Sequence, residues 1–290
     1  MTAPQHDPAI TVVIPTYNRG AEVCAAIQSV LSQTGTSFAV VVVDDGSTDD
    51  TLERLLSVQD DRVTVLPSPH EGVSAARNRG AASATTPWLT FLDSDDLAVP
   101  GWLAALVGAL SGGADLVTCG ATLCYPDGTT RTPSPVPLGP AFGSITGHFL
   151  AGSFAVATEL FRAVGGYLPG LAYSENTELG MRLGTEVERR GARWVALPDA
   201  LVQVAATERA YDAERYYASG RAVLAASGER LALDPHLLAL YLGITGTAAA
   251  RCGHTADARR LLWKAWRLEP FTVRHPLRLC RSQLPLRRWR

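Results

Sequence analysis

Carboxylates gather at two places in the first hundred residues, each directly after a short apolar run. Asp44 and Asp45 follow one run, and Asp93, Asp95 and Asp96 follow another. Like charges repel, so such carboxylates are costly to bring together without a cation. Mg²⁺ or Mn²⁺ prefers oxygen ligands and usually binds one or two carboxylates together with substrate phosphates. The pattern predicts a divalent-ion site that neutralises a phosphate leaving group, although a solvated turn with Asp95 or Asp96 capping the next helix also explains it.

Two further segments carry side chains suited to a phosphorylated ligand. One is Pro15-Thr-Tyr-Asn18, and the other is the run 72–80, which contains Arg77. An arginine here either pairs with a diphosphate or is an exposed helix charge. Gly72 permits close approach of the backbone to a ligand. His70, a lone histidine in a loop, is either a metal ligand or a solvated side chain.

The elements that position these residues alternate between two sequence periods. Short β-branched or apolar runs predict strands, and apolar stripes at helical spacing predict helices between them. Ser47, with Asp50 three residues on, resembles a capping box that starts the second helix. Strands that alternate with helices predict a parallel sheet with right-handed crossovers, and ligands bind beyond the carboxyl ends of its strands. The expected strands are 10–14, 38–43, 62–66 and 88–92, and the expected helices are 22–33, 47–56 and 72–84.

The second half of the chain has a different organisation. A strand is expected over 115–125, with a turn at 126–128 and an irregular proline-rich surface segment at 132–140. From about residue 208 the pattern is helical, and its last part, 253–270, looks like half of a tetratricopeptide repeat. We therefore expect an α/β domain over residues 1–206 and a helical appendage with a basic tail over 207–290.

Composition excludes several classes of protein. The 290 residues are 47% hydrophobic and 19% charged with a net charge of −2, which excludes a mainly disordered chain and a strongly basic nucleic-acid binder. Five scattered cysteines predict neither a disulfide framework nor a zinc site. The first nine residues lack an apolar core, and no apolar run is long enough to span a bilayer, so we expect a cytoplasmic protein.

The C-terminal tail, 274–290, interleaves six arginines with leucines and Trp289. Two prolines prevent one continuous helix. Such a tail can attach to anionic lipid headgroups at the inner membrane face, or it can be a solvated or self-packed terminus.

Together these pieces resemble the family 2 glycosyltransferases, which have the GT-A fold. The resemblance covers roughly residues 9–205. The motifs that carry it are Thr11-Val-Val-Ile-Pro-Thr-Tyr-Asn-Arg19, Val41-Val-Val-Asp-Asp-Gly-Ser-Thr-Asp49, Gly72-Val-Ser-Ala-Ala-Arg-Asn-Arg-Gly80, Phe91-Leu-Asp-Ser-Asp-Asp96 and Phe161-Arg-Ala-Val-Gly-Gly-Tyr167. It implies a GT-A-like, Rossmann-type mixed sheet flanked by helices, and an inverting transfer of a sugar from a nucleotide-diphosphate sugar.

The resemblance also implies roles for individual residues. Nucleotide-binding positions, and the two positions that would hold Mn²⁺ or Mg²⁺, follow from the motifs. Asp45 would hydrogen-bond the base, and a pyrimidine imide N–H suits it, so UDP or dTDP is favoured over GDP. The nucleotide-binding positions are Pro15, Thr16, Tyr17, Asp45, Arg77, Asp93 and Ser94, and the metal-binding positions are Asp95 and Asp96.

The sequence departs from the family at the general base. The family usually has a Glu-Asp pair where this chain has Glu175-Asn176, and an amide cannot act as a base. Three interpretations stay open. Glu175 or Glu178 takes the proton from the acceptor; or the acceptor is a thiol that needs little base help; or the chain binds the donor without transferring the sugar.

The partners are therefore a nucleotide-sugar donor and an acceptor of unknown kind: a glycan, a lipid-linked sugar, a peptide or a small molecule. The helical appendage could also mediate a homo-oligomer. A nucleotidyltransferase is the rival enzyme class, but it would normally show a Gly-rich phosphate loop with a lysine near the N-terminus. Lys264 is the single lysine of this chain.

Overall fold

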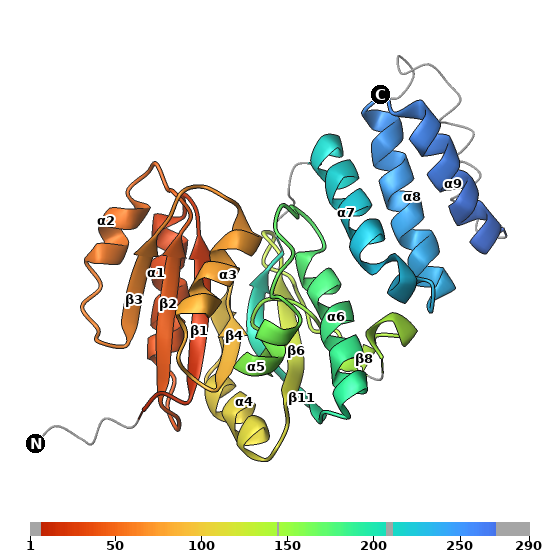
Figure 1. Ribbon diagram of the computed structural model, residues 1–290. Coiled ribbons are helices and arrows are strands. Elements are labelled where there is room, and N and C mark those ends of the chain that lie inside the picture. The colour runs from red at the N-terminus through yellow and green to blue at the C-terminus, as the bar shows by residue number, and fades with distance from the viewer. Residues whose placement is uncertain (1–6, 144, 207–210, 271–290) are drawn as a thin grey trace, which may run out of the picture.

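The computed structural model describes residues 7–143, 145–206 and 211–270. Its first half contains four parallel strands in the spatial order β3-β2-β1-β4, with α1, α2 and α3 as the connections (Figure 1). The predicted strands and crossovers are thus confirmed. The elements are β1 (Ile10–Thr16), α1 (Gly20–Leu31), β2 (Phe38–Asp44), α2 (Thr51–Leu56), β3 (Val63–Pro67), α3 (Val73–Ser83) and β4 (Trp88–Phe91).

The second half extends this sheet with mixed polarity. β10 pairs antiparallel with both β4 and β6, β11 runs parallel to β6, and β5 lies at the edge. The predicted mixed α/β sheet is confirmed, and the strand expected over 115–125 is β6. The elements are β5 (Leu97–Ala98), α4 (Trp102–Ser111), β6 (Leu116–Cys124), β7 (Thr130–Arg131), β8 (Val136–Pro137), η1 (Pro140–Phe142), β9 (Thr146–Gly147), β10 (Phe154–Ala157), α5 (Thr158–Ala163), α6 (Glu175–Arg190) and β11 (Trp194–Ala205).

Both faces of the sheet are covered by helices. Val12 packs in one core with residues of α1 and α4, whereas its neighbour Val13 packs in the other core with residues of α3, α5 and α6. This alternation follows from the period of a strand, in which successive side chains point to opposite faces. A fully buried Trp102 fills the first core, and a Phe91–Phe154–Phe161 group fills the second.

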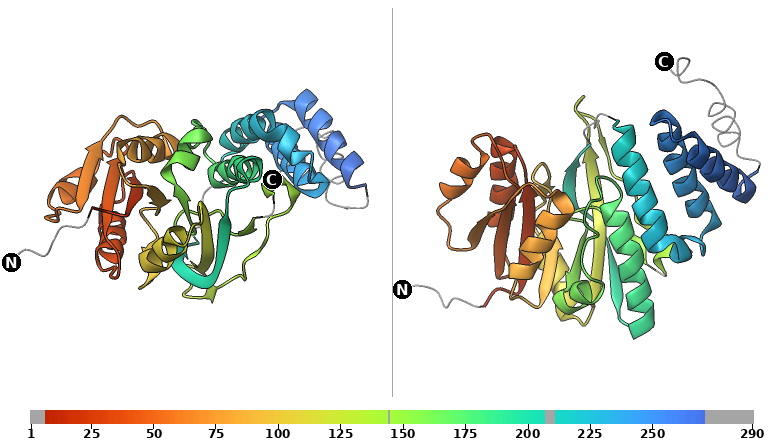
Figure 2. Two further views of the ribbon diagram at one scale, coloured as in Figure 1. Left: turned by 60° about the horizontal axis from the view of Figure 1, so that its bottom comes forward. Right: turned by 45° about the horizontal axis from the view of Figure 1, so that its top comes forward.

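Three helices follow the sheet: α7 (Ala213–Leu231), α8 (Pro235–Arg251) and α9 (Thr255–Leu268). Asp212 and Asp234 cap the first two by accepting hydrogen bonds from Arg215 N and Leu237 N. Figures 1 and 2 show α7 next to α6 and α9 at the far edge of the molecule. The helical pattern expected from about residue 208 corresponds to these three helices. The boundary at residue 206 stays a prediction, as does the structure of the tail 274–290, which lies outside the described residues.

The capping box predicted at Ser47 is wrong. Helix α2 begins at Thr51, with Asp50 at its N-cap position. Ser47 Oγ instead bonds to the Asp44 carboxylate and accepts a hydrogen bond from Asn18 N at 2.9 Å. The hydroxyl therefore ties the loop after β2 to the loop after β1, because both loops leave the sheet at the same edge.

None of the helices in the described ranges combines the length and the apolar character needed to cross a bilayer.

The close packing of α3 on the sheet depends on Gly80. A Cβ at this position would lie 2.4 Å from Val13 Cγ1 and 3.2 Å from Val43 Cγ2. We expect Gly80→Ala to lower the free energy of unfolding by about 1–3 kcal/mol, because overpacking a filled interface forces the backbone to shift. Urea unfolding followed by circular dichroism measures this.

Gly108, within α4, is the matched control, because a Cβ there would meet nothing within 4 Å. Gly108→Ala should raise stability by up to about 1 kcal/mol through helix propensity. Equal effects from the two substitutions would contradict the packing argument.

Candidate active site

A cavity of about 670 Å³ lies at the carboxyl ends of β1, β2 and β4. Its walls come from the loops after these strands, the start of α3, residues 170–172, the start of α6 and one side of α7. This is the place where an open α/β sheet binds its ligands. Of the predicted nucleotide-binding residues, the cavity is lined by Pro15, Thr16, Tyr17, Asp45, Arg77, Asp93 and Ser94.

Arg77 forms the floor of the cavity. Its side chain is 1% exposed, and its guanidinium donates to Asp93 Oδ1 at 2.5 Å and to Glu175 Oε1 at 3.2 Å. The same guanidinium lies 4.9 Å from the centre of the Tyr167 ring. Burial acts to lower the pKa of Arg77, but the charges of Asp93 and Glu175 outweigh it, and the pKa is raised. A permanent buried cation therefore joins α3, the end of β4 and the start of α6.

The loop between β3 and α3 is held by Asp45. The two oxygens of its carboxylate accept hydrogen bonds from Glu71 N and Gly72 N, each at 2.9 Å. Gly72 has φ 92°, which favours glycine, and precedes the first turn of α3. His70 Nδ1 lies 3.0 Å from Asp45 Oδ2, and its ring stacks on Tyr17 with centroids 4.1 Å apart. His70 thus makes an aromatic rim rather than a metal-ligand cluster.

Three buried polar atoms in the described residues have no hydrogen-bond partner: Thr16 Oγ1, Ser74 Oγ and Arg77 Nε. All three belong to residues that line this cavity. Unpaired buried polar groups are rare and cost about 1–3 kcal/mol each. A ligand that carries several acceptor oxygens would satisfy them.

The acidic motif after β4 divides between the cavity and the protein interior. Asp93 and Ser94 line the cavity, whereas Asp95 Oδ1 lies 2.7 Å from Arg19 Nη1. Asp96 is 3% exposed and accepts a hydrogen bond from Ala205 N at 2.9 Å, which ties the motif to β11. Burial, together with the nearby charge of Asp93, raises the pKa of Asp96 to about 8.

The chemistry of this donor set fits a hard divalent ion, since it offers carboxylate oxygens beside a cavity. Within the described part of the chain, no group of three or more His, Cys, Asp or Glu side chains is arranged to hold a metal. Arg19 supplies the positive charge beside Asp95 in this arrangement. Binding through Asp95 and Asp96 would therefore need substrate phosphates as further ligands, and the two metal-binding positions stay a prediction.

The three candidate catalytic positions point in different directions. Glu175 lines the cavity. Asn176 is outside the lining and accepts a hydrogen bond from Tyr167 Oη at 2.9 Å. Glu178 is fully buried, 2.7 Å from Arg182 Nε, and it accepts from Ser227 Oγ of α7. Of the two alternatives for the base, Glu175 lies at the cavity, whereas the Glu178 carboxylate lies in the contact with α7; which of them acts stays a prediction.

The sequence did not predict the other residues that line the cavity, because they come from segments without a motif. Arg215, Ala218 and Ser219 of α7 line the wall opposite the nucleotide-binding motifs. Ser219 Oγ accepts a hydrogen bond from Ala172 N at 3.0 Å and so holds the 170–172 loop. Asp212 is the N-cap residue of α7 and is typical of a helix start, but no sequence pattern indicates that this helix lies at the cavity.

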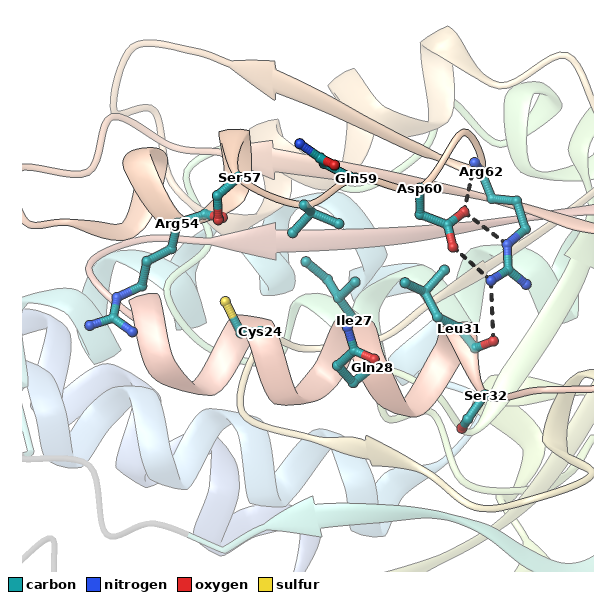
Figure 3. A pocket seen from close by; sticks show the side chains of 11 residues that line it. Cys24, Ile27, Gln28, Leu31, Ser32, Arg54, Ser57, Gln59, Asp60 and Arg62 are labelled. Atoms are coloured by element: carbon teal, nitrogen blue, oxygen red, sulfur yellow. Dashed lines mark hydrogen bonds and ion pairs between the residues drawn. The ribbon is translucent and has the colours of Figure 1, made fainter.

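A different pocket, of about 530 Å³, lies between α1 and the segment from α2 to β3 (Figure 3). Its charged side chains are already paired: Asp60 lies 2.8 Å from Arg62 Nη2, and Arg54 pairs with Asp50. None of the unpartnered buried atoms belongs to its lining residues. The cavity at the strand ends is therefore the better candidate for the functional site.

Comparison with known proteins agrees with this fold. Residues 11–162 match the family model described as glycosyl transferase family 2. An uncharacterized glycosyltransferase of Rickettsia felis is 46% identical over 94 residues, which are 32% of this chain and 15% of that protein. The Escherichia coli protein named UDP-Glc:alpha-D-GlcNAc-diphosphoundecaprenol beta-1,3-glucosyltransferase WfgD is 34% identical over 99 residues, 34% of this chain and 38% of that protein.

The chain thus spans well under two thirds of the length of these relatives. The crystal structure of S. aureus TarS 1-349 in complex with UDP-GlcNAc superposes with a TM-score of 0.68 at 18% identity, covering 94% of this chain and 88% of that one. That likeness concerns the fold, which is the GT-A type expected from the motifs. The chain belongs to glycosyl transferase family 2.

Asp96 makes stability depend on pH. Its folded pKa of about 8 exceeds the usual value of 3.8, so the unfolded chain loses this proton first. Stability from this group is complete below about pH 4 and falls as the pH rises toward 8, by at most about 1.4 kcal/mol per pH unit. Asp96→Asn should remove this slope, measured as the difference in unfolding free energy between the two proteins from pH 5 to pH 8. Parallel pH profiles would contradict the assignment.

Proposed function

We propose that this chain transfers a sugar from a nucleotide-diphosphate sugar to an acceptor, with inversion at the anomeric carbon, and that the reaction needs Mn²⁺ or Mg²⁺. The observation that carries the proposal is the cavity at the strand ends, where Nε of the buried Arg77 and the hydroxyls of Thr16 and Ser74 have no partner and suit an oxygen-rich ligand. Membership of glycosyl transferase family 2 supports the same reaction class.

A uridine or thymidine diphosphate donor is favoured. Asp45 holds Glu71 N through Oδ1 and Gly72 N through Oδ2, and Oδ2 also lies beside His70 Nδ1, so the second lone pair of Oδ1 is the one that can accept a pyrimidine imide N–H. Tyr17 and His70 offer an aromatic surface beside it. The printed names of WfgD and of the TarS complex contain UDP-Glc and UDP-GlcNAc, which supports UDP as the carrier.

The other residues of the motifs are proposed to bind the diphosphate, the ribose and the divalent ion. Thr16 and Ser74 donate to the nucleotide, and Arg77 attracts the diphosphate through its unpartnered Nε. Asp93 and Ser94 face the ribose. A divalent ion held by Asp95 and Asp96 would displace the proton of the Asp96 carboxyl and would neutralise charge on the leaving nucleoside diphosphate.

Glu175 is the proposed general base. It lines the cavity, and an acceptor hydroxyl within hydrogen-bond reach of its carboxylate would give up its proton there. Glu178 is not retained for this role, since its carboxylate is fully buried against Arg182.

The alternative function is a non-catalytic module that binds the nucleotide sugar. The observation that favours it is Asn176, an amide at the usual position of the base, whose oxygen is already bound by the Tyr167 hydroxyl. The acceptor is a glycan, a lipid-linked sugar, a peptide or a small molecule under the first proposal, and there is none under this one.

Nucleotide binding tests the donor site. A ligand at about 100 times its dissociation constant adds roughly 2.7 kcal/mol of stability, so we expect UDP or dTDP with Mn²⁺ to raise the melting temperature by a few degrees. GDP and CDP should have smaller effects, and each nucleotide is also measured without metal. The absence of a shift with any nucleotide, with or without metal, would refute the proposal.

Paired substitutions in α6 test the base. Glu175→Gln should lower turnover at least about tenfold, because an amide cannot take the acceptor proton. Glu178→Gln should instead lower the melting temperature, since it leaves Arg182 without its buried partner, and change turnover of the folded protein far less. The readout is release of nucleoside diphosphate, whereas pyrophosphate would indicate a nucleotidyltransferase. If Glu175→Gln keeps full turnover, Glu175 is not the base; if the unchanged chain binds donor without turnover, the binding module holds.

A further inference from the structure

Helix α9 exposes two tryptophans on a face that no described element covers. Its inner face is complete, with Ala258, Leu262 and Ala265 buried in the contact with α8. Trp263 and Trp266 lie on the other side, with 46% and 37% of their surface exposed. Each tryptophan therefore leaves more than a third of its large apolar surface in contact with water, which the packing of α9 on α8 does not explain.

The same face carries an excess of positive charge. Four cations lie among the tryptophans, and the guanidinium of Arg267 is 4.7 Å from the Trp263 ring centre. Asp257, the acidic residue of the helix, is paired with Arg260 at 2.7 Å. In the described part of the chain no ion pair engages Arg259, Lys264 or Arg267. We call the residues Arg259, Arg260, Trp263, Lys264, Trp266 and Arg267 the outer face of α9.

Two apolar side chains of α8 extend this surface. Leu240 and Ile244 are one helical turn apart and are 43% and 36% exposed. A Cβ at Gly246 would lie 2.8 Å from Leu262 Cγ, which fixes the register of the two antiparallel helices. With 100° per residue, that register puts Leu240 and Ile244 on the side of the hairpin that borders Trp266.

The chemistry of this surface selects its occupant. A purely apolar partner would strip water from four cations without replacing it, which is costly. An anionic bilayer accepts both kinds of group: tryptophan rings sit at the level of the headgroups, and arginine and lysine side chains reach the lipid phosphates. The charge continues along the chain, since no acidic residue follows Glu269 while six arginines occur in 274–290.

We propose that the outer face of α9 binds the surface of anionic lipid bilayers. The inference goes beyond the proposed glycosyl transfer and does not depend on it. Figures 1 and 2 show α9 as the outermost of the three C-terminal helices, with α8 between it and α7, so a flat surface can reach it. The outer face of α9 would attach the protein to the bilayer through its C-terminal helices, and α7 would still line the cavity.

Co-sedimentation of the full chain with vesicles tests the proposal. Vesicles of phosphatidylglycerol and phosphatidylcholine are compared with vesicles of phosphatidylcholine alone. We expect binding to the anionic vesicles that weakens as salt is raised. Trp263→Ala/Trp266→Ala should lower the partition coefficient at least about tenfold. Arg259→Gln/Lys264→Gln should also lower it at least about tenfold, since each cation near an anionic surface contributes about fivefold.

Matched controls are Leu56→Ala in α2 and Arg131→Gln in β7, which change an exposed apolar and an exposed cationic side chain outside the three C-terminal helices and should leave binding unchanged. Melting temperatures verify that every variant is folded, and the charge variant keeps both tryptophans in case their removal unfolds the chain. Deleting 274–290 measures the share of the tail. Binding that is absent, or that both α9 variants leave intact, overturns the proposal. So does a change confined to the oligomeric state, which would mark the face as a contact between two copies.

Discussion

One buried positive charge organises this molecule. The Arg77 guanidinium is almost fully removed from water, and a cation in that position is tolerable only with partners. The partners come from three separate segments: Asp93 from the end of β4, Glu175 from the start of α6, and the ring of Tyr167 from the loop between α5 and α6. The segments that surround the cavity are therefore held together largely by their contacts with this buried charge.

Carboxylates elsewhere in the site accept hydrogen bonds from backbone amides and so hold loops in place. Asp45 holds two amides of the loop before α3, and Asp96 holds Ala205 N at the end of β11. Asp44 and Ser47 join the loops after β1 and β2. The aspartates of these motifs thus hold the loops around the cavity in place. Their carboxylates are already hydrogen-bonded to the protein in the absence of a ligand.

Much of the first half of the chain could be predicted because its signals are local. Apolar runs such as 10–14 predict strands by themselves, and parallel strands bring the residues that follow them to one edge. The prediction of a capping box was wrong because a tertiary contact competes for the same side chain: Ser47 bonds across loops instead of capping a helix. The base stays a prediction, but tertiary contacts also engage the Glu178 carboxylate, which is bound by Arg182 and Ser227. No local pattern could reveal that Arg215 and Ser219 reach the cavity, because that depends on how α7 docks.

The hydrogen bond from Ala172 N to Ser219 Oγ links one wall of the cavity to α7. The match to the family model ends at residue 162, whereas this wall is built by residues 170–172, Glu175 and one side of α7. A displacement of α7 would therefore carry the 170–172 loop with it and change the width of the cavity. The wall at the strand ends would stay in place, because α7 contributes no strand to the sheet.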